Sequence, residues 1–391
     1  MGDKIMGWRV TLFMMKPTGA WRARGLGAKL AVVAPALGLL ACSSSPGSTD
    51  AATDAVVREL VIERVVDLGQ LPQPSTTVVG RDGGPAGLLG GRILWTFGDT
   101  FLQARNPIDN SNVLSATGGW SSVAAPLVLT QPVDSGGFPA QLIPYTAAEL
   151  AQNQTAPLDG WALWPGTMID TGEAEGLLIF QRIKRSNGTG YDSMGVGTAR
   201  IAVDATVATR VVGDLFAPPE PLFMPQSVAN GMVYALACNS GGFLNIGCKM
   251  GRAPVAAAGT RAAYLFFDGS DWQADITRAK VTIDGLGGTP TLSWNPHLGR
   301  FLAITGRILS STMQLRPADC IEGPWSAPVE IAASADGSTG IFAPTSADAS
   351  NYVIIEHPEL RSAYGRELVI SYSRPTEPFR GDVRLARITL R

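Results

Sequence analysis

Short apolar runs recur at close intervals along the chain, and each is bounded by glycine, proline, asparagine or aspartate. Runs of this length between turn residues are typical of β-strands, because strands are short and these four residues favour tight turns. We therefore predict strands at Arg92–Phe97, Leu177–Phe180, Met232–Leu236, Tyr264–Phe267, Phe301–Thr305, Tyr352–Ile355, Leu368–Tyr372 and Val383–Ile388.

Helical patterning is confined to one segment. Tyr145–Gln154 is predicted to be helical, because Thr146 and Glu149 have the spacing of a capping box. Strands do not alternate with amphipathic helices elsewhere, so the pattern predicts an all-β domain.

Two turn-and-tryptophan units favour a propeller over a β-sandwich. They are Asp268-Gly-Ser-Asp-Trp272 and Gly323-Pro-Trp325. Such units are expected where the hairpin of one blade places an aromatic side chain against the next blade. The sequence therefore predicts a single five-bladed β-propeller over residues 59–391, preceded by a flexible tether at 42–58.

The first residues have the features of a secretory signal. Basic residues precede the apolar run Leu30–Leu40, which is too short to span a bilayer as a permanent helix. Leu39-Leu-Ala41 leads directly into Cys42, which predicts a lipoprotein signal peptide over residues 1–41 and acylation of Cys42. The alternative is an ordinary signal peptide followed by an unmodified cysteine. We expect a lipid-anchored protein of the cell envelope, at the outer membrane or cell surface.

The charge balance argues against one class of partner. Removal of residues 1–41 leaves 25 basic and 32 acidic residues, a net charge of −7. Nucleic-acid binding depends on a basic surface, so we expect no nucleic-acid partner, and we expect a monomer.

Three cysteines follow Cys42. Cys238 and Cys248 flank an Asn-Ser-Gly-Gly turn and are predicted to form a disulfide across a hairpin, as suits an exported protein. The alternative is that all three are buried free thiols. In the disulfide scheme Cys320 has no partner.

Histidines are too few for several kinds of chemistry. The chain has only His297 and His357, which nearly excludes zinc sites built from two or three histidines. It also lacks the Gly-x-Ser-x-Gly sequence of a nucleophile elbow. We therefore expect no metal and no cofactor, and acid–base chemistry falls to carboxylates.

One glycine turn brings two aspartates to the same end of a hairpin. Gly90-Gly91 suits a two-residue turn in which both positions have positive φ, and it joins Ala86–Leu89 to Arg92–Phe97. Asp82 precedes the first strand and Asp99 follows the second. Because paired strands lie about 5 Å apart, the two carboxylates are placed to face one cleft. The alternative is that each aspartate caps a turn.

The segment Gly80–Phe101, with its Trp-Thr-Phe-Gly-Asp-Thr run, resembles the opening blade of domain-of-unknown-function family 4185. Further similarities follow in order and extend the resemblance over about residues 66–391: Trp164-Pro165, Gly195–Arg200, Asn295–Arg300, Gly323–Ser326 and His357–Leu360. That family resembles five-bladed propeller glycosidases. Some members are grouped as glycoside hydrolase family 183, which cleaves D-arabinofuranose polymers internally.

The resemblance implies roles for particular residues. Asp82 and Asp99 match acidic positions at the propeller mouth and are the candidate catalytic pair. Asp99 is the stronger candidate, because Gly98 before it is expected to leave room for a substrate. His357 and Glu359 are expected to bind substrate in the same funnel.

Trp164, beside Pro165, is a further candidate for stacking on a sugar ring. The resemblance thus implies an extracytoplasmic hydrolase of a furanosyl polysaccharide, plausibly an endo-D-arabinanase. The alternatives are a non-catalytic surface propeller that binds glycan or protein, and a structural envelope lipoprotein.

Overall fold

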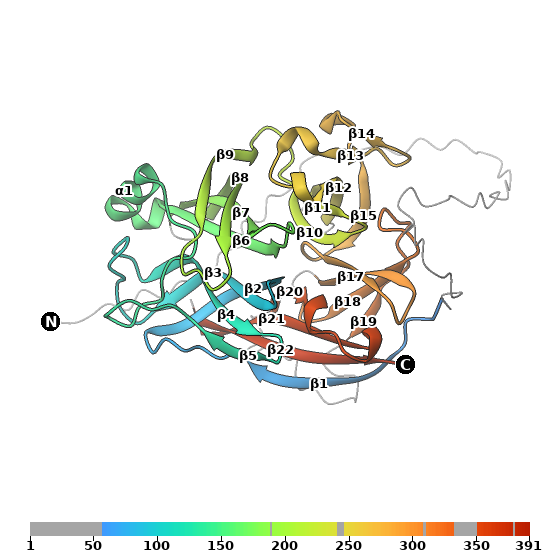
Figure 1. The fold of residues 1–391 in the computed structure, drawn as a ribbon, viewed down its shortest axis with the longest axis horizontal. Coiled ribbons are helices and arrows are strands. Elements are labelled where there is room, and N and C mark those ends of the chain that lie inside the picture. Colours follow the sequence, from blue (N-terminus) through green and yellow to red (C-terminus); the bar gives the residue numbers. More distant parts are fainter. Residues whose placement is uncertain (1–56, 188–189, 241–245, 308–309, 332–349, 378–379) are drawn as a thin grey trace, which may run out of the picture. The chain divides into compact units, whose positions relative to one another are not determined.

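The computed structural model describes residues 57–187, 190–240, 246–307, 310–331, 350–377 and 380–391. Five antiparallel sheets follow one another along the chain and form the blades of a β-propeller (Figure 1). This confirms the predicted all-β, five-bladed fold. Each of the eight predicted strands is present, either with ends that differ by at most one residue or as part of a longer strand. Residues 1–56 lie outside the described part of the chain. They comprise the predicted signal peptide (1–41) and nearly all of the predicted tether (42–58), with Cys42.

The first two blades are four-stranded meanders, in which strand order in the sheet follows the chain. Blade 1 consists of β2 (Val78–Leu89), β3 (Arg92–Leu102), β4 (Val113–Ser122) and β5 (Ala125–Thr130). Blade 2 consists of β6 (Trp161–Ile169), β7 (Glu175–Ser186), β8 (Gly190–Ala202) and β9 (Thr209–Phe216).

Blade 3 carries an additional strand, β15, which pairs with β12 beside the main strand order. Its strands are β10 (Met224–Ala229), β11 (Met232–Ser240), β12 (Ile246–Pro254), β13 (Leu265–Phe267), β14 (Trp272–Gln273) and β15 (Val281–Leu286). Blade 4 is again a meander, of β16 (Thr291–Asn295), β17 (Arg300–Gly306), β18 (Met313–Ala318) and β19 (Val329–Ile331).

The last blade joins the two ends of the propeller. Its strands β20 (Tyr352–Glu356), β21 (Glu367–Glu377) and β22 (Arg380–Leu390) are completed by the first strand, β1 (Ile62–Gln70). The antiparallel register of β1 against β22 runs from Ile62 opposite Leu390 to Gln70 opposite Arg384. Backbone hydrogen bonds between the start and the end of the chain therefore close the ring.

The predicted helix is α1 (Ala147–Thr155), and it begins with the predicted capping box: the Thr146 side chain accepts from the Glu149 N–H, and the Glu149 carboxylate accepts from the Thr146 N–H. Single 3₁₀ turns occur at η1 (Pro157–Asp159), η2 (Val255–Ala257), η3 (Arg261–Ala263), η4 (Ile276–Arg278), η5 (Pro358–Leu360) and η6 (Ala363–Gly365). Within the described part of the chain, no helix has the length and apolar character needed to cross a membrane.

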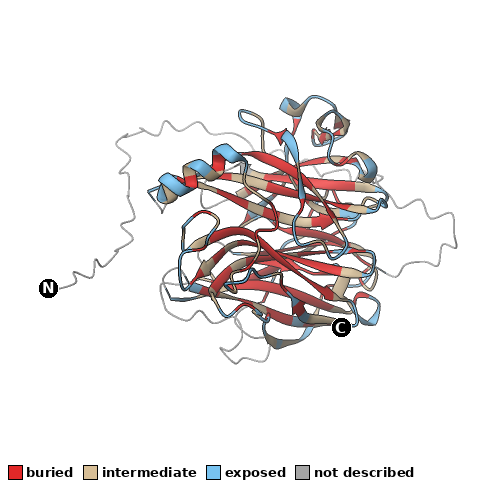
Figure 2. Ribbon diagram, turned by 60° about the vertical axis from the view of Figure 1, so that its left-hand side comes forward, coloured by how far each residue is buried: buried red, intermediate tan, exposed pale blue. Residues whose placement is uncertain are grey.

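The core lies between blades rather than within them, and the strands are buried along much of their length (Figure 2). Among the described residues, apolar side chains form five clusters, one at each junction between neighbouring blades. The cluster between blades 3 and 4 contains both Trp272 and Trp325. The two turn-and-tryptophan units therefore do place aromatic side chains between neighbouring blades.

Cys238 and Cys248 lie opposite each other on β11 and β12 and form a disulfide, with their Cα atoms 4.0 Å apart. Cys320 is also disulfide-bonded, so the expectation that it has no partner is wrong. The turn sequence between Cys238 and Cys248 pointed to the first bridge, whereas no local sequence feature pointed to a bridge at Cys320.

Candidate active site

The glycine turn places the two aspartates as the sequence predicted. Gly90 and Gly91 have φ values of +55° and +75°, which joins β2 to β3 through a tight turn. At the far end of this hairpin Arg81 lies opposite Thr100, and the register is irregular between Arg81 and Gly83. Asp82 and Asp99 therefore lie side by side, each half-buried.

The two aspartates are connected to each other and to two further blades. The Asp99 N–H donates to Asp82 Oδ1 at 2.8 Å, and the Tyr352 hydroxyl of blade 5 donates to Asp82 Oδ2 at 3.3 Å. Two donors from blade 2 share Asp99 Oδ1, namely Arg185 Nη2 at 2.7 Å and Trp164 Nε1 at 3.2 Å. The site is thus assembled from three blades.

The electrostatic environments of the two carboxylates differ. Burial, together with the negative charge of Asp99, raises the pKa of Asp82 to about 7. The hydrogen bonds from Asp99 N–H and Tyr352 act in the opposite direction but do not outweigh it. Asp99 instead forms an ion pair with Arg185, in which both side chains are largely buried. Near neutral pH, this arrangement places a proton on one carboxyl beside a negatively charged one.

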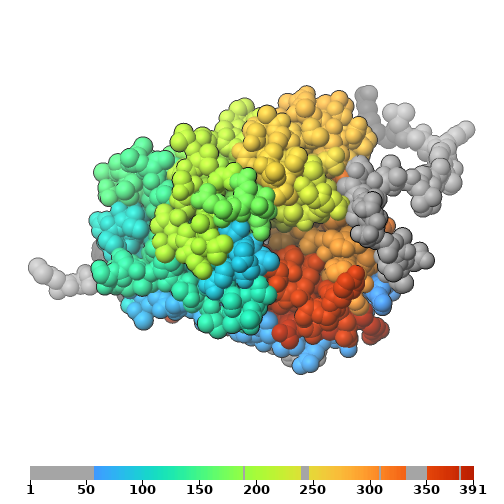
Figure 3. Space-filling model, viewed as in Figure 1, coloured from blue at the N-terminus to red at the C-terminus, as the bar shows by residue number. Residues whose placement is uncertain are grey.

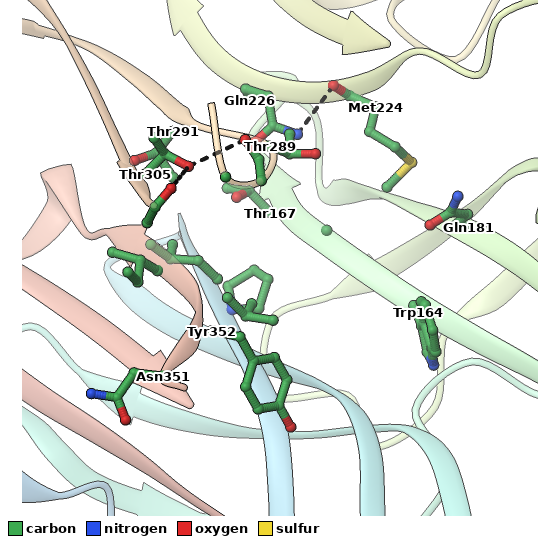
Figure 4. Close-up of a pocket in the computed structure, with 18 of the residues that line it drawn as sticks. Trp164, Thr167, Gln181, Met224, Gln226, Thr289, Thr291, Thr305, Asn351 and Tyr352 are labelled. Carbon is green, nitrogen blue, oxygen red and sulfur yellow. Dashed lines mark hydrogen bonds between the residues drawn. The ribbon is translucent and has the colours of Figure 1, made fainter. Parts of the chain in front are cut away.

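A cavity of about 480 Å³ lies beside this pair. Its lining includes Met224, Thr291 and Tyr352, which are the first residues of β10, β16 and β20, and Trp164 from the first half of β6. Figure 3 shows a hollow in the surface where the parts of the chain in different colours meet. Figure 4 shows Thr289, Thr291 and Thr305 on one side of the view and Trp164 and Tyr352 away from them, with Thr167 on the same strand as Trp164.

Trp164 and Tyr352 connect the cavity to the aspartates. Each lines the cavity and each also donates a hydrogen bond to one aspartate. Asp82 and Asp99 themselves are not part of the lining, and among the described residues the lining contains no carboxylate. Threonine hydroxyls and glutamine amides supply most of its polar groups, which suits a ligand rich in hydroxyl groups.

The space beside Gly98 is already occupied. A Cβ atom at this position would lie 3.0 Å from Asp82 Oδ1 and 3.4 Å from Trp164 Cδ1. Gly98 therefore allows these two side chains to approach the hairpin, rather than leaving room for a substrate as the sequence suggested.

Glu359 lies at the other end of the propeller axis from the aspartates. It lines a second cavity, of about 350 Å³, which is bounded by later residues of innermost strands, such as Ile169 of β6 and Trp294 of β16. The two cavities share Thr167, Pro225, Gln226 and Thr291, so they adjoin. The structure therefore brings Trp164 to the aspartate pair but does not bring Glu359 there.

His357 is fully buried and lines neither cavity. Its Nδ1 lies 3.1 Å from Glu359 Oε1 and its Nε2 lies 2.8 Å from Ser371 Oγ. Its ring also lies against that of Trp95, with centroids 4.8 Å apart. This placement favours support of Glu359 over direct contact with a ligand.

The contacts of His357 have the pattern of a serine–histidine–acid triad, with Ser371 and Glu359 as the outer members. Ser371 is fully buried as well and lines neither cavity. A nucleophile needs access to its substrate, so this arrangement does not fit acyl transfer in the folded protein.

Sequence reasoning missed Arg185, Tyr352 and Tyr191. Tyr191 is well exposed, and its ring lies edge-on to that of Trp164 with centroids 5.1 Å apart. Tyr352 begins a predicted strand, and the first residue of an innermost strand lies at the cavity end of a propeller; that signal was present in the sequence. Arg185 lies beside Lys184 near the end of β7, and nothing local distinguishes it as the partner of Asp99.

In the described segments, no group of three or more histidine, cysteine or acidic side chains is placed to hold a metal ion. The functional groups gathered at the aspartate pair are instead a tyrosine, a tryptophan and an arginine.

The comparisons with known proteins give a fold but no sequence family. No model of a known protein family matches the chain, and no curated protein sequence matches it. The resemblance to family 4185 therefore has no support from a family model.

Among solved structures, the chain resembles an exo-β-1,3-galactanase from Phanerochaete chrysosporium, determined with β-1,3-galactotriose, at a TM-score of 0.50 and 14% sequence identity. The match covers 82% of this chain and 64% of the galactanase chain, so this chain spans less than two thirds of the galactanase.

Two further similar structures are a family 117 glycoside hydrolase from Zobellia galactanivorans and an α-L-arabinofuranosidase from Podospora anserina determined with cellotriose. The first has a TM-score of 0.49 at 10% identity, with 84% of this chain and 90% of that chain covered. The second has a TM-score of 0.46 at 11% identity, with 84% and 97% covered.

At these identities the likeness shows the fold alone. The chain is a five-bladed β-propeller that shares its fold with propeller glycoside hydrolases.

Proposed function

We propose that this protein is an extracytoplasmic glycoside hydrolase that cleaves a furanosyl polysaccharide, and that its substrate is a D-arabinofuranose polymer cleaved internally. The observation that carries the proposal is the Asp82–Asp99 pair beside the cavity, in which one carboxyl has a raised pKa and its neighbour is ion-paired. The resemblance to family 4185 supports the choice of sugar, and the shared propeller fold supports the reaction class.

In the proposed reaction each carboxyl has one role. Asp82 gives its proton to the glycosidic oxygen as the bond from that oxygen to the anomeric carbon breaks. Asp99 provides the negative charge that assists the attack on the anomeric carbon, and a water molecule supplies the hydroxyl group of the new reducing end. The remaining proton of that water passes to the carboxylate pair and restores the proton that Asp82 gave away. Trp164, which lines the cavity, would stack on a sugar ring, and Tyr191 would extend this aromatic surface through its edge-on contact with Trp164.

A second candidate function is a surface propeller that binds glycan without cleaving it. The composition of the cavity lining favours this second function. The lining offers aromatic side chains, hydroxyls and amides but no carboxylate among the described residues. Incubation of the mature chain with a panel of neutral polysaccharides separates the two functions. New reducing ends support the hydrolase, whereas retention of the chain on a polysaccharide without product supports the binding protein.

The pH dependence of hydrolysis follows from Asp82. This carboxyl must be protonated to act as the acid, and its pKa is raised to about 7. We expect kcat/KM to fall tenfold per pH unit as the pH rises above about 7, since the protonated fraction of Asp82 falls in that way. A pH–rate profile between pH 4 and 9 measures this, and activity that stays level from pH 6 to 9 contradicts the assignment of Asp82 as the acid.

We also propose that the mature protein is anchored to the cell envelope through acylated Cys42. The Leu-Leu-Ala sequence before this cysteine motivates the proposal. Labelling with radioactive palmitate is expected for the wild type and should be absent from Cys42→Ser. Non-reducing peptide mapping is a second measurement, because an acylated sulfur is unable to form a disulfide and Cys42 is the one cysteine of the sequence left to pair with Cys320 once Cys238 and Cys248 are joined. Equal labelling of both proteins, or recovery of Cys42 in a disulfide, contradicts acylation.

A further inference from the structure

Arg185 reaches the aspartate pair from the neighbouring blade. It lies in β7 of blade 2, whereas Asp99 lies in β3 of blade 1, and Arg185 Nη2 is 2.7 Å from Asp99 Oδ1. The two side chains are only 16% and 14% exposed, so water screens the ion pair weakly. Arg185 Nη1 also donates to the Trp161 carbonyl at 3.4 Å, which helps to fix the guanidinium.

Arg185 provides the only cationic side chain that contacts either aspartate among the described residues. The other titratable groups that face this cluster are Asp82 from β2, Asp109 from the segment between β3 and β4, Tyr145 before α1, and Tyr352 from β20. Burial lowers the pKa of Arg185, but the charge of Asp99 and the nearby Tyr145 and Asp109 outweigh it, and the net direction is upward. The cation therefore persists in this cluster.

The two aspartates differ in the charge of the groups that donate hydrogen bonds to them. Asp99 accepts from the Arg185 guanidinium as well as from the neutral Trp164 indole. Among the described residues, the donors to Asp82 are both neutral, the Asp99 N–H and the Tyr352 hydroxyl. A carboxylate beside a cation is stabilised in its charged form, and two adjacent carboxylates disfavour a second negative charge. The contacts thus make the two aspartates chemically unequal.

We propose that Arg185 is a positioning residue that keeps Asp99 as the charged member of the pair and so leaves the proton on Asp82. This inference rests on the proposed function for its effect on hydrolysis, although the proton distribution itself exists in the free protein. Without the cation, the pair binds its protons at higher pH, and the charged carboxylate that assists attack on the anomeric carbon is lost at the working pH.

Activity measured against pH tests the consequence for hydrolysis. For Arg185→Gln we expect kcat to fall at least about tenfold near pH 6, with KM little changed and the pH optimum displaced upward. Arg185→Lys keeps the charge without the planar fork and should recover part of kcat. The matched control is Arg92→Gln, which removes another Arg–Asp pair between blades 1 and 2. In that pair Arg92 Nε lies 2.9 Å from Asp204 Oδ1. The control variant should have the kcat, KM and pH optimum of the wild type.

Carboxyl ¹³C NMR of the mature chain without substrate tests the proton distribution directly, with Asp82→Asn and Asp99→Asn used for assignment. The titration of the pair should move to higher pH in Arg185→Gln by about 1 pH unit and stay in place in Arg92→Gln. This readout needs no hydrolysis, so it holds even if the proposed function fails. An unchanged titration in a folded Arg185→Gln protein overturns the inference, as does a rise in KM alone, which would make Arg185 a substrate contact.

Discussion

Asp99→Asn should lower hydrolysis of a furanosyl polysaccharide by at least about a hundredfold, and Asp82→Asn should do the same. The first substitution removes the charged carboxylate that Arg185 and Trp164 hold in place. The second removes the carboxyl whose pKa is raised to about 7 and which supplies the proton. Steady-state rates of reducing-end formation at pH 6 measure both effects.

Folding should survive these substitutions, because asparagine has nearly the same shape as aspartate and neither residue belongs to the apolar clusters beside blade 1. Asp204→Asn is the matched control, since Asp204 also pairs with an arginine across blades 1 and 2 but lies away from the cavity lining. The control should keep full activity. Full activity in a correctly folded Asp99→Asn protein would end the catalytic assignment of Asp99.

Arg361→Met should destabilise the protein by about 3–5 kcal/mol, because it leaves a buried carboxylate without its cation. Arg361 Nε and Nη2 lie 2.7 and 2.5 Å from Glu356 Oε1, and the side chains are 10% and 0% exposed. Arg361 also donates to the Ser293 hydroxyl and the Trp294 carbonyl, so the pair connects blade 5 to blade 4. The free energy of unfolding from urea titration at pH 7 measures the loss.

The control for this substitution is Arg200→Met. Arg200 pairs with Glu173 at 3.1 Å, but the two side chains are 37% and 61% exposed. An exposed pair of this kind contributes about 0–1 kcal/mol, so the control should unfold close to the wild type. Equal stability of the Arg361→Met and Arg200→Met proteins would show that the buried pair does not hold blades 4 and 5 together.

The fold was largely predictable because its signals are local. Each of the eight predicted strands contains a short apolar run between turn residues, and the capping box of Thr146 and Glu149 sets the start of α1 within one segment. The hairpin geometry of Asp82 and Asp99 was predictable for the same reason, since Gly90-Gly91 lies midway between them and requires positive φ at both positions.

The partners of the aspartates were not predictable, because they come from distant parts of the chain. Arg185 lies 86 residues from Asp99, and Tyr352 lies 270 residues from Asp82. Only closure of the ring of blades brings them together. Such contacts depend on how the blades pack, which the sequence around each residue does not encode.

The sequence did not show that Glu359 lies in the adjoining cavity rather than beside the aspartates, for a related reason. Tyr352 begins β20 and Glu359 follows its end, and the two ends of an innermost strand lie at different cavities. The strand between Tyr352 and Glu359 thus separates them along the propeller axis. Asking which residues begin an innermost strand would have selected Tyr352 rather than Glu359.

The most direct measurement is the release of reducing ends from a linear D-arabinofuranose polymer by the mature chain, beside a protein carrying both Asp82→Asn and Asp99→Asn. The account predicts a series of shortened oligosaccharides from the wild type and none from the double variant at equal protein concentration. Equal release from both proteins would show that the pair is not catalytic. Absence of product from the wild type on this polymer and on other furanosyl polymers would contradict the proposed hydrolase.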